Sequence, residues 1–306
     1  MQIGKPYAIN EKGRCIINED SIFPQKNKAN ETNRFFVICD GIGGHENGEI
    51  ASKSVCDSFA EFLETVPPNN FNENIFNGAL NYAFDELDKK QDSCKTRKKM
   101  GTTLAMLYLN DNQAFMAHIG DSRIYHLRKN RNGKVNILYK SSDHSLVNEL
   151  LKAEVITKEE ADNYPKKNMI TRAMQPYLEK RHKAEIRIKG DIKAGDRFFL
   201  CSDGVYESLT DEQLCAIADN ADDETMMNII QTLCEEHSRD NFSAWLVTVI
   251  EGINPSEEPE EKTCINFPHH GEKKKSKKRG LITGIVVATI SIVIYLFFIF
   301  QILYNK

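Results

Sequence analysis

The stretch RFFVICDGIGGHENGEIASKSVCDSFAEFL, residues 34–63, decides the fold. Residues 34–39 are short, largely apolar and rich in aromatic and branched side chains, which predicts a β-strand. Asp40-Gly41 then ends this strand, because aspartate and glycine favour turns. The apolar residues that follow at helical spacing are Ala51, Val55, Phe59 and Leu63. We therefore expect a strand, a turn and an amphipathic helix in direct succession.

Five further segments share the composition of this strand. They are residues 103–109, 113–119, 123–127, 197–201 and 243–250. Turn residues at Asn110-Asp111-Asn112 and Gly120-Asp121-Ser122 separate the first three, so we expect 103–127 to form an antiparallel meander. Two more helical stripes are Phe76, Leu80, Phe84, Leu87 and Met226, Ile230, Leu233. Runs of strands with helices early and late predict an α+β fold in which helices cover antiparallel sheets.

The composition indicates a folded domain. Of the 306 residues, 41% are hydrophobic, which is enough for a sizeable core. No two of the eight cysteines form a Cys-x-x-Cys pair and the N-terminus does not resemble a secretion signal, so we expect reduced thiols in a cytosolic compartment. Before the last 34 residues the chain holds 33 Lys or Arg against 44 Asp or Glu. This acidic body argues against nucleic-acid binding and suits a protein that collects cations.

The segment LITGIVVATISIVIYLFFIFQILY, residues 281–304, contains 24 residues and no charge. As a helix it would span about 36 Å at about 1.5 Å per residue, whereas the hydrocarbon core of a bilayer is about 30 Å thick. We expect a single transmembrane helix that anchors the protein in the lipid bilayer. The polybasic segment KKKSKKRG, residues 273–280, precedes it, and the positive-inside rule places the body in the cytoplasm.

The residues between the body and this anchor have the composition of a linker. Residues 253–272, INPSEEPEEKTCINFPHHGE, combine three prolines with acidic and polar neighbours and show no apolar period. The expected organisation is therefore a globular domain over 1–252, a flexible linker over 253–272, a polybasic segment over 273–280 and a transmembrane helix over 281–304.

Four segments place an aspartate beside glycine or another small residue at the end of a predicted strand. They are Asp40-Gly41, Gly120-Asp121-Ser122-Arg123, Ser202-Asp203-Gly204 and Arg239-Asp240-Asn241. Each one alone is explained equally well by an ordinary turn. Together they predict a carboxylate cluster, because the ends of neighbouring strands meet at one edge of a layered sheet. Such a cluster needs cations, and oxygen ligands select hard ions, Mg²⁺ or Mn²⁺.

Eight blocks of sequence, in order, carry a family resemblance. They are Asn18-Glu19-Asp20, CDGIGGHENGEIAS (39–52), MGTT (100–103), GDSR (120–123), DHSLVNEL (143–150), ITRAM (170–174), CSDGVYESLTDEQL (201–214) and RDNFSAWLV (239–247). Over residues 1–251 the chain resembles the type 2C (PPM) metal-dependent serine/threonine protein phosphatases in their bacterial form. The resemblance implies a four-layer α-β-β-α sandwich of two antiparallel sheets flanked by helices, with a two-metal centre between the sheet ends.

The resemblance also assigns roles to individual residues. Asp40 would bridge two ions, the Gly41 carbonyl would ligate one of them, and Asp203 and Asp240 would complete the protein ligands of the other. In the same way Glu19 and Asp20 would hold metal-bound waters, and Asp121 would help to bind a third, weaker ion. Two divalent ions would activate a water that hydrolyses phosphoserine or phosphothreonine directly, without a phosphoenzyme.

The residue that binds the substrate phosphate is less well defined. Arg14 is the candidate, because a guanidinium matches phosphate oxygens in a bidentate way. It lies five residues before Glu19, whereas the family arginine usually lies four before, so Lys12 is an alternative. Animal members carry a histidine where this chain has Ile42, which leaves the general acid unassigned. His45 either protonates the leaving oxygen or caps the following helix.

Two further regions bear on the site. Residues 144–172 resemble the bacterial flap beside the active site, but Ala153 and Met174-Gln175 replace glycines that are common there. Ser142-Asp143-His144 is not expected to form a hydrolase triad, because triad members converge from separate segments.

The predicted function is reversal of serine/threonine kinase signalling at the cytoplasmic face of a membrane. The expected partners are phosphorylated Ser/Thr proteins, chiefly a membrane Ser/Thr kinase and its targets, and no nucleic acid. One alternative is a non-catalytic adaptor that binds phosphoproteins at the membrane. Another, a metal-dependent phosphodiesterase or nuclease, fits the ions but not the acidic body.

Overall fold

A computed structural model describes residues 1–252 of the protein, apart from 43–46, 95–98, 112 and 166–168. The predicted linker, polybasic segment and transmembrane helix, residues 253–304, lie outside this part of the chain and stay predictions. Among the residues that the structure does describe, no helix has both the length and the apolar character needed to cross a membrane. The seven cysteines of this part are free thiols, as expected.

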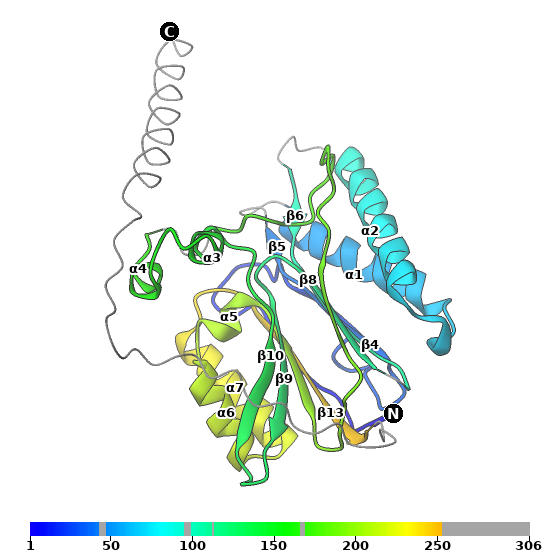
Figure 1. The fold of residues 1–306 in the computed structure, drawn as a ribbon. Coiled ribbons are helices and arrows are strands. Elements are labelled where there is room, and N and C mark those ends of the chain that lie inside the picture. Colours follow the sequence, from blue (N-terminus) through cyan, green and yellow to red (C-terminus); the bar gives the residue numbers. More distant parts are fainter. Residues whose placement is uncertain (43–46, 95–98, 112, 166–168, 253–306) are drawn as a thin grey trace, which may run out of the picture. The chain divides into compact units, whose positions relative to one another are not determined.

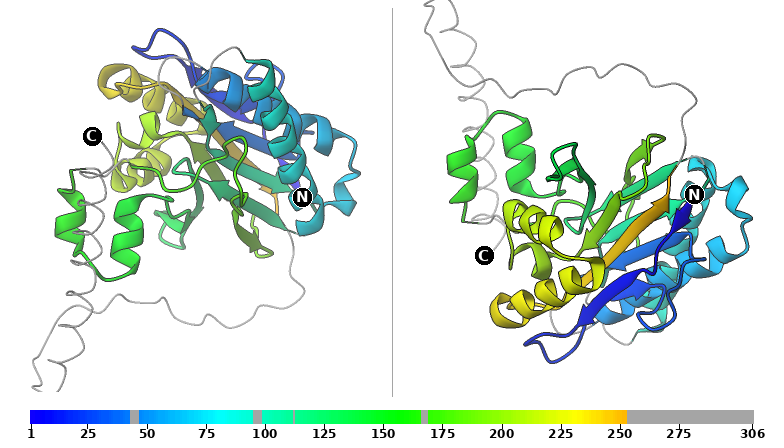
Figure 2. Two further views of the ribbon diagram at one scale, coloured as in Figure 1. Left: turned by 90° about the horizontal axis from the view of Figure 1, so that it is seen from above. Right: turned by 90° about the horizontal axis from the view of Figure 1, so that it is seen from below.

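Two antiparallel β-sheets form the centre of the fold (Figures 1 and 2). Along the first sheet the strands are β1 (Gln2–Ile3), β13 (Phe242–Glu251), β12 (Arg197–Cys201), β9 (Arg123–Lys129) and β10 (Val135–Lys140), with β2 (Tyr7–Glu11) also paired to β13. Along the second they are β11 (Glu185–Lys189), β8 (Ala114–Ile119), β7 (Leu104–Leu109), β4 (Phe35–Cys39) and β3 (Ser21–Phe23). A short ladder joins β5 (Gly41–Ile42) to β6 (Gly101–Thr102).

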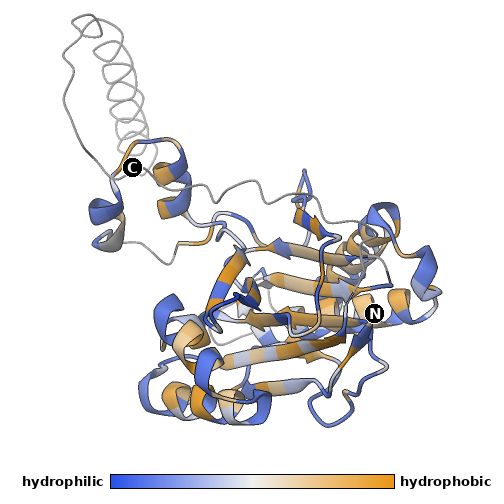
Figure 3. Ribbon diagram, turned by 60° about the horizontal axis from the view of Figure 1, so that its bottom comes forward, coloured by the Kyte–Doolittle hydropathy of each residue, from blue (hydrophilic) through white to orange (hydrophobic). Residues whose placement is uncertain are grey.

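Alternating side chains of the strands build two kinds of core. On β4, Phe36 and Ile38 pack between the sheets, while Phe35, Val37 and Cys39 pack toward helices, and all five are buried. This alternation follows from the two-residue period of a strand, and it is why the strand is apolar throughout. Figure 3 shows apolar residues concentrated along the strands, with hydrophilic residues on the outer parts of the helices.

Helices cover the outer face of each sheet. The second sheet carries α1 (Gly48–Glu64) and α2 (Glu73–Ser93), and the first carries α5 (Asp203–Tyr206), α6 (Asp211–Asn220) and α7 (Asp223–His237). The apolar stripe from Ala51 to Leu63 lies on the buried side of α1, as its spacing predicted. Between β10 and β11 the chain forms two shorter helices, α3 (Leu146–Lys152) and α4 (Lys158–Asp162). The α+β sandwich with helices outside two antiparallel sheets is thus confirmed.

The predicted meander over 103–127 is wrong in its last step. β7 pairs with β8 in the second sheet, but β9 lies between β12 and β10 in the first. The chain crosses from one sheet to the other at Gly120, whose φ of +102° is in the left-handed region. Turn residues alone do not distinguish a hairpin from a crossover between stacked sheets, since both need the same backbone freedom.

Candidate active site

Asp40 stands at the end of β4, where its backbone is fixed by a neighbouring threonine. The Asp40 N–H donates to Thr103 Oγ1 at 2.9 Å, and the Thr103 N–H donates to the Asp40 carbonyl at 2.8 Å. A Cβ on Gly41 would lie 2.4 Å from the Gly48 carbonyl oxygen and 2.6 Å from that of Glu19. Only glycine at position 41 therefore lets the start of α1 and the backbone of Glu19 approach so closely beside Asp40.

The same threonine connects Asp40 to Asp121. Thr103 Oγ1 lies 2.7 Å from Ser122 Oγ, and a Cβ on Gly120 would come within 2.7 Å of Thr103 Cγ2. Asp121 is only 5% exposed. Its Oδ2 accepts a hydrogen bond of 3.4 Å from the Tyr206 hydroxyl, whereas its buried Oδ1 has no partner within the described part of the chain. A buried carboxylate oxygen that accepts no hydrogen bond is typical of a cation ligand.

Asp203 and Asp240 approach from the other sheet. Ser202, before Asp203, donates its hydroxyl hydrogen to Asp20 Oδ2 at 2.7 Å. A Cβ on Gly204 would lie 2.1 Å from the carbonyl oxygen of Asn241, so the segments that carry Asp203 and Asp240 touch through backbone. Residues from positions 20, 203 and 240 therefore meet at one end of the sandwich.

The electrostatics of these aspartates reflect their burial and their nearness to other carboxylates. Burial, and then the negative charges of Asp20, Asp203, Asp121 and Asp240, hold the pKa of Asp40 well above its usual range. Burial followed by the charges of Asp121, Asp240 and Asp20 does the same for the pKa of Asp203. Burial likewise raises the pKa of Asp20 to about 6, and the pKa of Asp121 to about 6. Like charges packed together in this way need a compensating cation.

The donor set of the cluster fits hard divalent ions. Carboxylate and carbonyl oxygens are the ligands that Mg²⁺ and Mn²⁺ prefer. The buried Oδ1 of Asp121, which has no hydrogen-bond partner among the described residues, is such an oxygen. The Glu19 carboxylate lies against Gly48, where a Cβ would be 2.8 Å from its Oε1. The residues that could hold or surround ions are Glu19, Asp20, Asp40, Gly41, Asp121, Asp203 and Asp240.

Arg14 lies on the rim of the cluster. Its Nη2 donates to the Glu236 carbonyl at 2.8 Å, near the C-terminal end of α7, and its side chain is exposed. The next residue, Cys15, places its Sγ 3.6 Å from Asp240 Oδ1. The loop that carries Arg14 and Lys12 therefore borders the site, and both residues remain candidates for phosphate binding.

Asn241 was not singled out by its sequence, yet it organises this loop. Its Nδ2 donates to the carbonyls of Lys12 and Ile17, both at 2.9 Å, and its Oδ1 accepts the Glu19 N–H at 2.8 Å. The side chain is 4% exposed. In the sequence, the one signal for this role of Asn241 was an amide side chain between an aspartate and an apolar strand. The partners of Asn241 lie more than 220 positions away.

We call residues 144–172 the flap, and we call the place where this segment begins and ends the flap root. Ser145 and Ile170 form a bridge, and Thr102 pairs with Met174 by two hydrogen bonds of 2.9 and 2.8 Å. Ala153 has ordinary backbone angles, φ −82° and ψ 1°, so no glycine is needed there; the positive φ falls on Glu154. Met174 is fully buried in the core beside α1 and α2. The flap is thus anchored at both ends.

Two other predicted details can be placed, and a third, His45, cannot. Asp143 accepts two hydrogen bonds from Arg123, and His144 Nδ1 accepts one from the Gly120 N–H, so Ser142-Asp143-His144 is not a triad. Ile42 lies in β5. His45 lies outside the described residues.

A cavity of about 620 Å³ opens beside the aspartate cluster. Its lining comes from the GDSR turn, the flap, the C-terminal end of α5 and the segment at the end of α7. Six of its residues are Asp121, Arg123, Asp143, Val147, Tyr206 and Arg239. The cavity is polar and charged at the aspartate end, and it is large enough to admit a side chain that carries a phosphate.

Comparison with known proteins agrees with this fold. The family model described as Protein phosphatase 2C matches residues 13–251. The protein phosphatase PhpP of Streptococcus pneumoniae (strain D39) is 34% identical over 202 residues, which are 64% of this chain and 76% of PhpP.

Solved structures give the same result. The serine/threonine phosphatase PstP/Ppp of Mycobacterium tuberculosis superposes with a TM-score of 0.70 and 25% identity over 82% of this chain and all of that chain. The PstP catalytic domain in complex with two manganese ions superposes with a TM-score of 0.68 and 25% identity over the same shares. The chain belongs to the protein phosphatase 2C family. Its activity is that of a protein serine/threonine phosphatase.

Proposed function

We propose that the protein hydrolyses phosphoserine and phosphothreonine in proteins with the help of Mn²⁺ or Mg²⁺ held by the aspartate cluster. The observation that carries this proposal is the meeting of Asp20, Asp203 and Asp240 at one end of the sandwich beside Asp40 and Asp121, where the buried Asp121 Oδ1 has no hydrogen-bond donor within the described part of the chain. Burial first, and neighbouring carboxylates after it, raise the pKa of Asp40, Asp203, Asp20 and Asp121, and such a buried acidic cluster needs cations for a stable charged state. The related PstP catalytic domain is complexed with two manganese ions.

Each residue of the cluster then has a role. Asp40, the Gly41 carbonyl, Asp203 and Asp240 would hold the ions. Bound divalent ions would supply two kinds of chemistry there, a lower pKa for a water and charge neutralisation of the phosphoryl oxygens.

The remaining carboxylates act around this centre. Glu19 and Asp20 would hold waters in place, and the Ser202 hydroxyl fixes the orientation of Asp20. Asp121, whose Oδ1 has no hydrogen-bond partner among the described residues, would hold a third, weaker ion next to the cavity. Arg14, or Lys12 in its place, would bind the phosphate from the rim and so orient the phosphorus for in-line attack.

Phosphopeptide hydrolysis by the full-length chain in detergent tests this proposal. Wild type should release phosphate from a phosphothreonine peptide only when Mn²⁺ or Mg²⁺ is added, and Asp40→Asn should abolish turnover. Arg14→Ala and Lys12→Ala should separate the two phosphate-binding candidates by a rise in KM. Hydrolysis without a divalent ion would contradict the mechanism, and phosphopeptide binding without turnover at every ion concentration would favour the adaptor.

The location proposed is the cytoplasmic face of a membrane. The supporting observation is the uncharged segment 281–304 preceded by the polybasic segment 273–280, with residues 253–272 as a linker from the catalytic domain, residues 1–252. Substrates would then be a membrane Ser/Thr kinase and its nearby targets. Deletion of 281–304 should move the protein from the membrane to the supernatant fraction; retention on membranes would exclude this anchor.

A further inference from the structure

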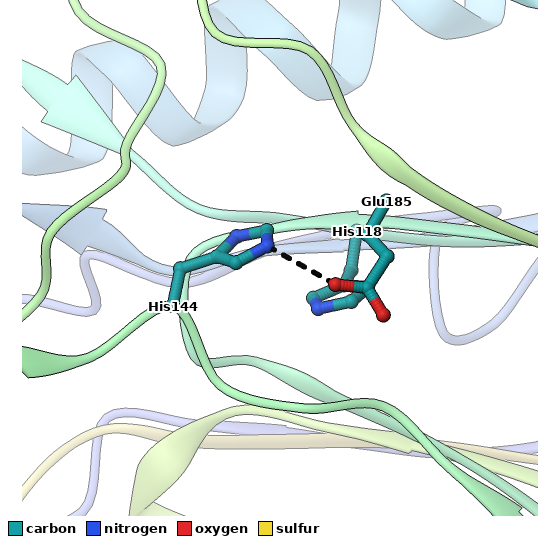
Figure 4. Close-up of side chains that lie close together, drawn as sticks. All are labelled: His118, His144 and Glu185. Atoms are coloured by element: carbon teal, nitrogen blue, oxygen red, sulfur yellow. Dashed lines mark ion pairs between the residues drawn. The ribbon is translucent and has the colours of Figure 1, made fainter. Parts of the chain in front are cut away.

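His118, His144 and Glu185 lie close together (Figure 4). They come from β8, from the segment after β10 and from β11. The two imidazole rings stack, with centroids 4.7 Å apart and an angle of 10° between the planes. His118 and His144 are 1% and 3% exposed, whereas Glu185 faces solvent.

The composition of this group resembles a transition-metal site, but its hydrogen bonds indicate a different role. The Gly120 N–H donates to His144 Nδ1 at 3.1 Å, so the lone pair of the ring is used on that nitrogen. In a neutral imidazole the proton is then on Nε2. The Glu185 Oε2 atom lies 3.6 Å from this nitrogen, beyond hydrogen-bond distance, and Nε2 has no hydrogen-bond partner within the described part of the chain (Figure 4). Parallel rings also keep the lone pairs of the two histidines in separate planes.

The surroundings keep His144 neutral. Burial, followed by the positive charges of His118, Arg172, Lys152 and His182, lowers the pKa of His144 to about 3. Glu185 is the negative group that faces its Nε2. The tautomer with the proton on Nε2 is therefore the form that meets the Gly120 N–H.

The backbone of His144 joins the GDSR turn to the flap. Its N–H donates to the Gly120 carbonyl at 2.9 Å, and its carbonyl accepts the Thr171 N–H at 2.8 Å. The ring and the backbone of His144 thus hold Gly120 by two hydrogen bonds. The third hydrogen bond joins His144 to Thr171, where the chain returns from the flap. The neighbouring bridge between Ser145 and Ile170 closes the flap at the same place.

Side chains on either side strengthen this connection. Arg123 donates two hydrogen bonds to Asp143, at 2.9 and 2.7 Å, and its guanidinium lies 3.5 Å from the ring centroid of Tyr206. The Tyr206 hydroxyl in turn contacts Asp121. Asn148, in α3, donates to the Asp143 carbonyl at 3.0 Å. The position of Asp121 therefore depends on contacts with the first residues of the flap.

We propose that His144 is a positioning residue, whose neutral ring with the proton on Nε2 holds the Gly120–Asp121 turn against the flap root. Displacement of the flap root then moves the Asp121 carboxylate and changes the affinity for the cation that it holds. This inference rests on the proposed function, because Asp121 acts there as a cation ligand.

A pair of substitutions in the full-length chain tests the inference. In His144→Asn the amide oxygen replaces Nδ1 as an acceptor, whereas the longer side chain of His144→Gln reaches the Nε2 position and leaves the Gly120 N–H without its partner. The Mn²⁺ concentration for half-maximal phosphopeptide hydrolysis should rise about 10-fold in His144→Gln, as in Asp121→Asn, because groups that orient a ligand typically change metal affinity by about 10–100-fold. His144→Asn should stay within about twofold of wild type by the same measure. Equal behaviour of the two variants would overturn the proposal.

The tautomer supplies a readout that does not depend on activity. In the protein labelled with ¹⁵N-histidine, the shift of His144 Nδ1 should be that of an unprotonated nitrogen. A protonated Nδ1, or inhibition by Zn²⁺ that His118→Ala removes, would overturn the proposal by showing a different use of the ring. A wild-type chain that hydrolyses no phosphopeptide with any cation would instead contradict the proposed function, and the ¹⁵N shift would still test the hydrogen bond.

Discussion

The guanidinium of Arg128 donates two hydrogen bonds to Asp196, from Nε to Oδ1 at 2.6 Å and from Nη2 to Oδ2 at 2.7 Å. Asp196 is completely buried, and it also meets His126 Nε2 at 2.9 Å and the Lys193 N–H at 3.0 Å. It thereby joins β9 to the turn before β12, far from the aspartate cluster.

Asp196→Asn should destabilise the fold by about 3 kcal/mol, because it removes one partner of a buried ion pair. Asp191 offers a matched control, since it binds the same arginine from an exposed position. Asp191→Asn should change the free energy of unfolding by less than about 1 kcal/mol. Urea denaturation of the two variants measures the difference, and equal losses would contradict the buried pair as the source of stability.

The same residue predicts a pH dependence of stability. Burial alone would raise the pKa of Asp196, but hydrogen bonds from Arg128, His126 and the Lys193 N–H hold that pKa below its usual range. A carboxyl with a lowered folded-state pKa stabilises the fold above its unfolded pKa of about 3.9, and this stability is lost as the pH falls through the folded value. Below about pH 4, wild type should therefore lose stability more steeply than Asp196→Asn in thermal unfolding.

Gly120→Ala should impair both stability and catalysis. A Cβ there would lie 2.7 Å from Thr103 Cγ2 at a φ of +102°, and relief of this clash would displace Asp121. Gly133, between β9 and β10, also has a positive φ, but nothing lies within 4 Å of its Cβ position. Gly133→Ala should cost only the backbone strain of about 1–2 kcal/mol and leave kcat unchanged. A normal kcat in Gly120→Ala would show that the turn tolerates displacement.

Asn241→Ala should loosen the loop that carries Arg14. Three hydrogen bonds at about 1 kcal/mol each predict a loss of about 2–3 kcal/mol, together with a higher KM for phosphopeptide. Asn220→Ala is the control, because Asn220 makes one exposed bond to the Ala216 carbonyl. Thermal unfolding and steady-state kinetics report the two effects, and an unchanged KM would separate Asn241 from substrate binding.

Removal of divalent ions should expose the repulsion within the cluster. Wild type should unfold at a lower temperature in EDTA than in Mn²⁺, since a bound ion at 100 times its Kd contributes about 2.7 kcal/mol. Asp203→Asn removes one of the charges that repel Asp40. In EDTA it should therefore unfold at a higher temperature than wild type, with little further gain from Mn²⁺. If Asp203→Asn instead unfolded at a lower temperature than wild type in EDTA, repulsion between the carboxylates would not be the dominant contribution.

The sequence predicted the parts of the fold that have a strong period. The strands at 35–39 and 197–201 and the stripe of α1 lie where apolar spacing put them, because both faces of these strands and one face of the helix are buried. β11 was missed, because its residues EIRIK are mostly exposed at a sheet edge. The crossover at Gly120 was missed as well, since sheet pairing is decided by distant partners.

The site was predictable to a similar extent. The aspartates could be named because Asp40, Asp121 and Asp203 each follow a strand, Asp240 precedes one, and they recur in a family order; the structure brings them together. Asn241, His144 and Tyr206 act through contacts with partners that are 222, 24 and 85 positions away in the sequence, so no local pattern indicated these roles. Motifs thus revealed the groups that carry charge, but not those that hold them in place.

The position of the cluster has a consequence for folding. Asp40 ends a strand of the second sheet, whereas Asp203 and Asp240 flank strands of the first, so neither half of the sandwich contains a complete ligand set. A chain with only one sheet formed would have no high-affinity ion site. Ion binding would then report the completion of folding, and a half-assembled intermediate would lack phosphatase activity.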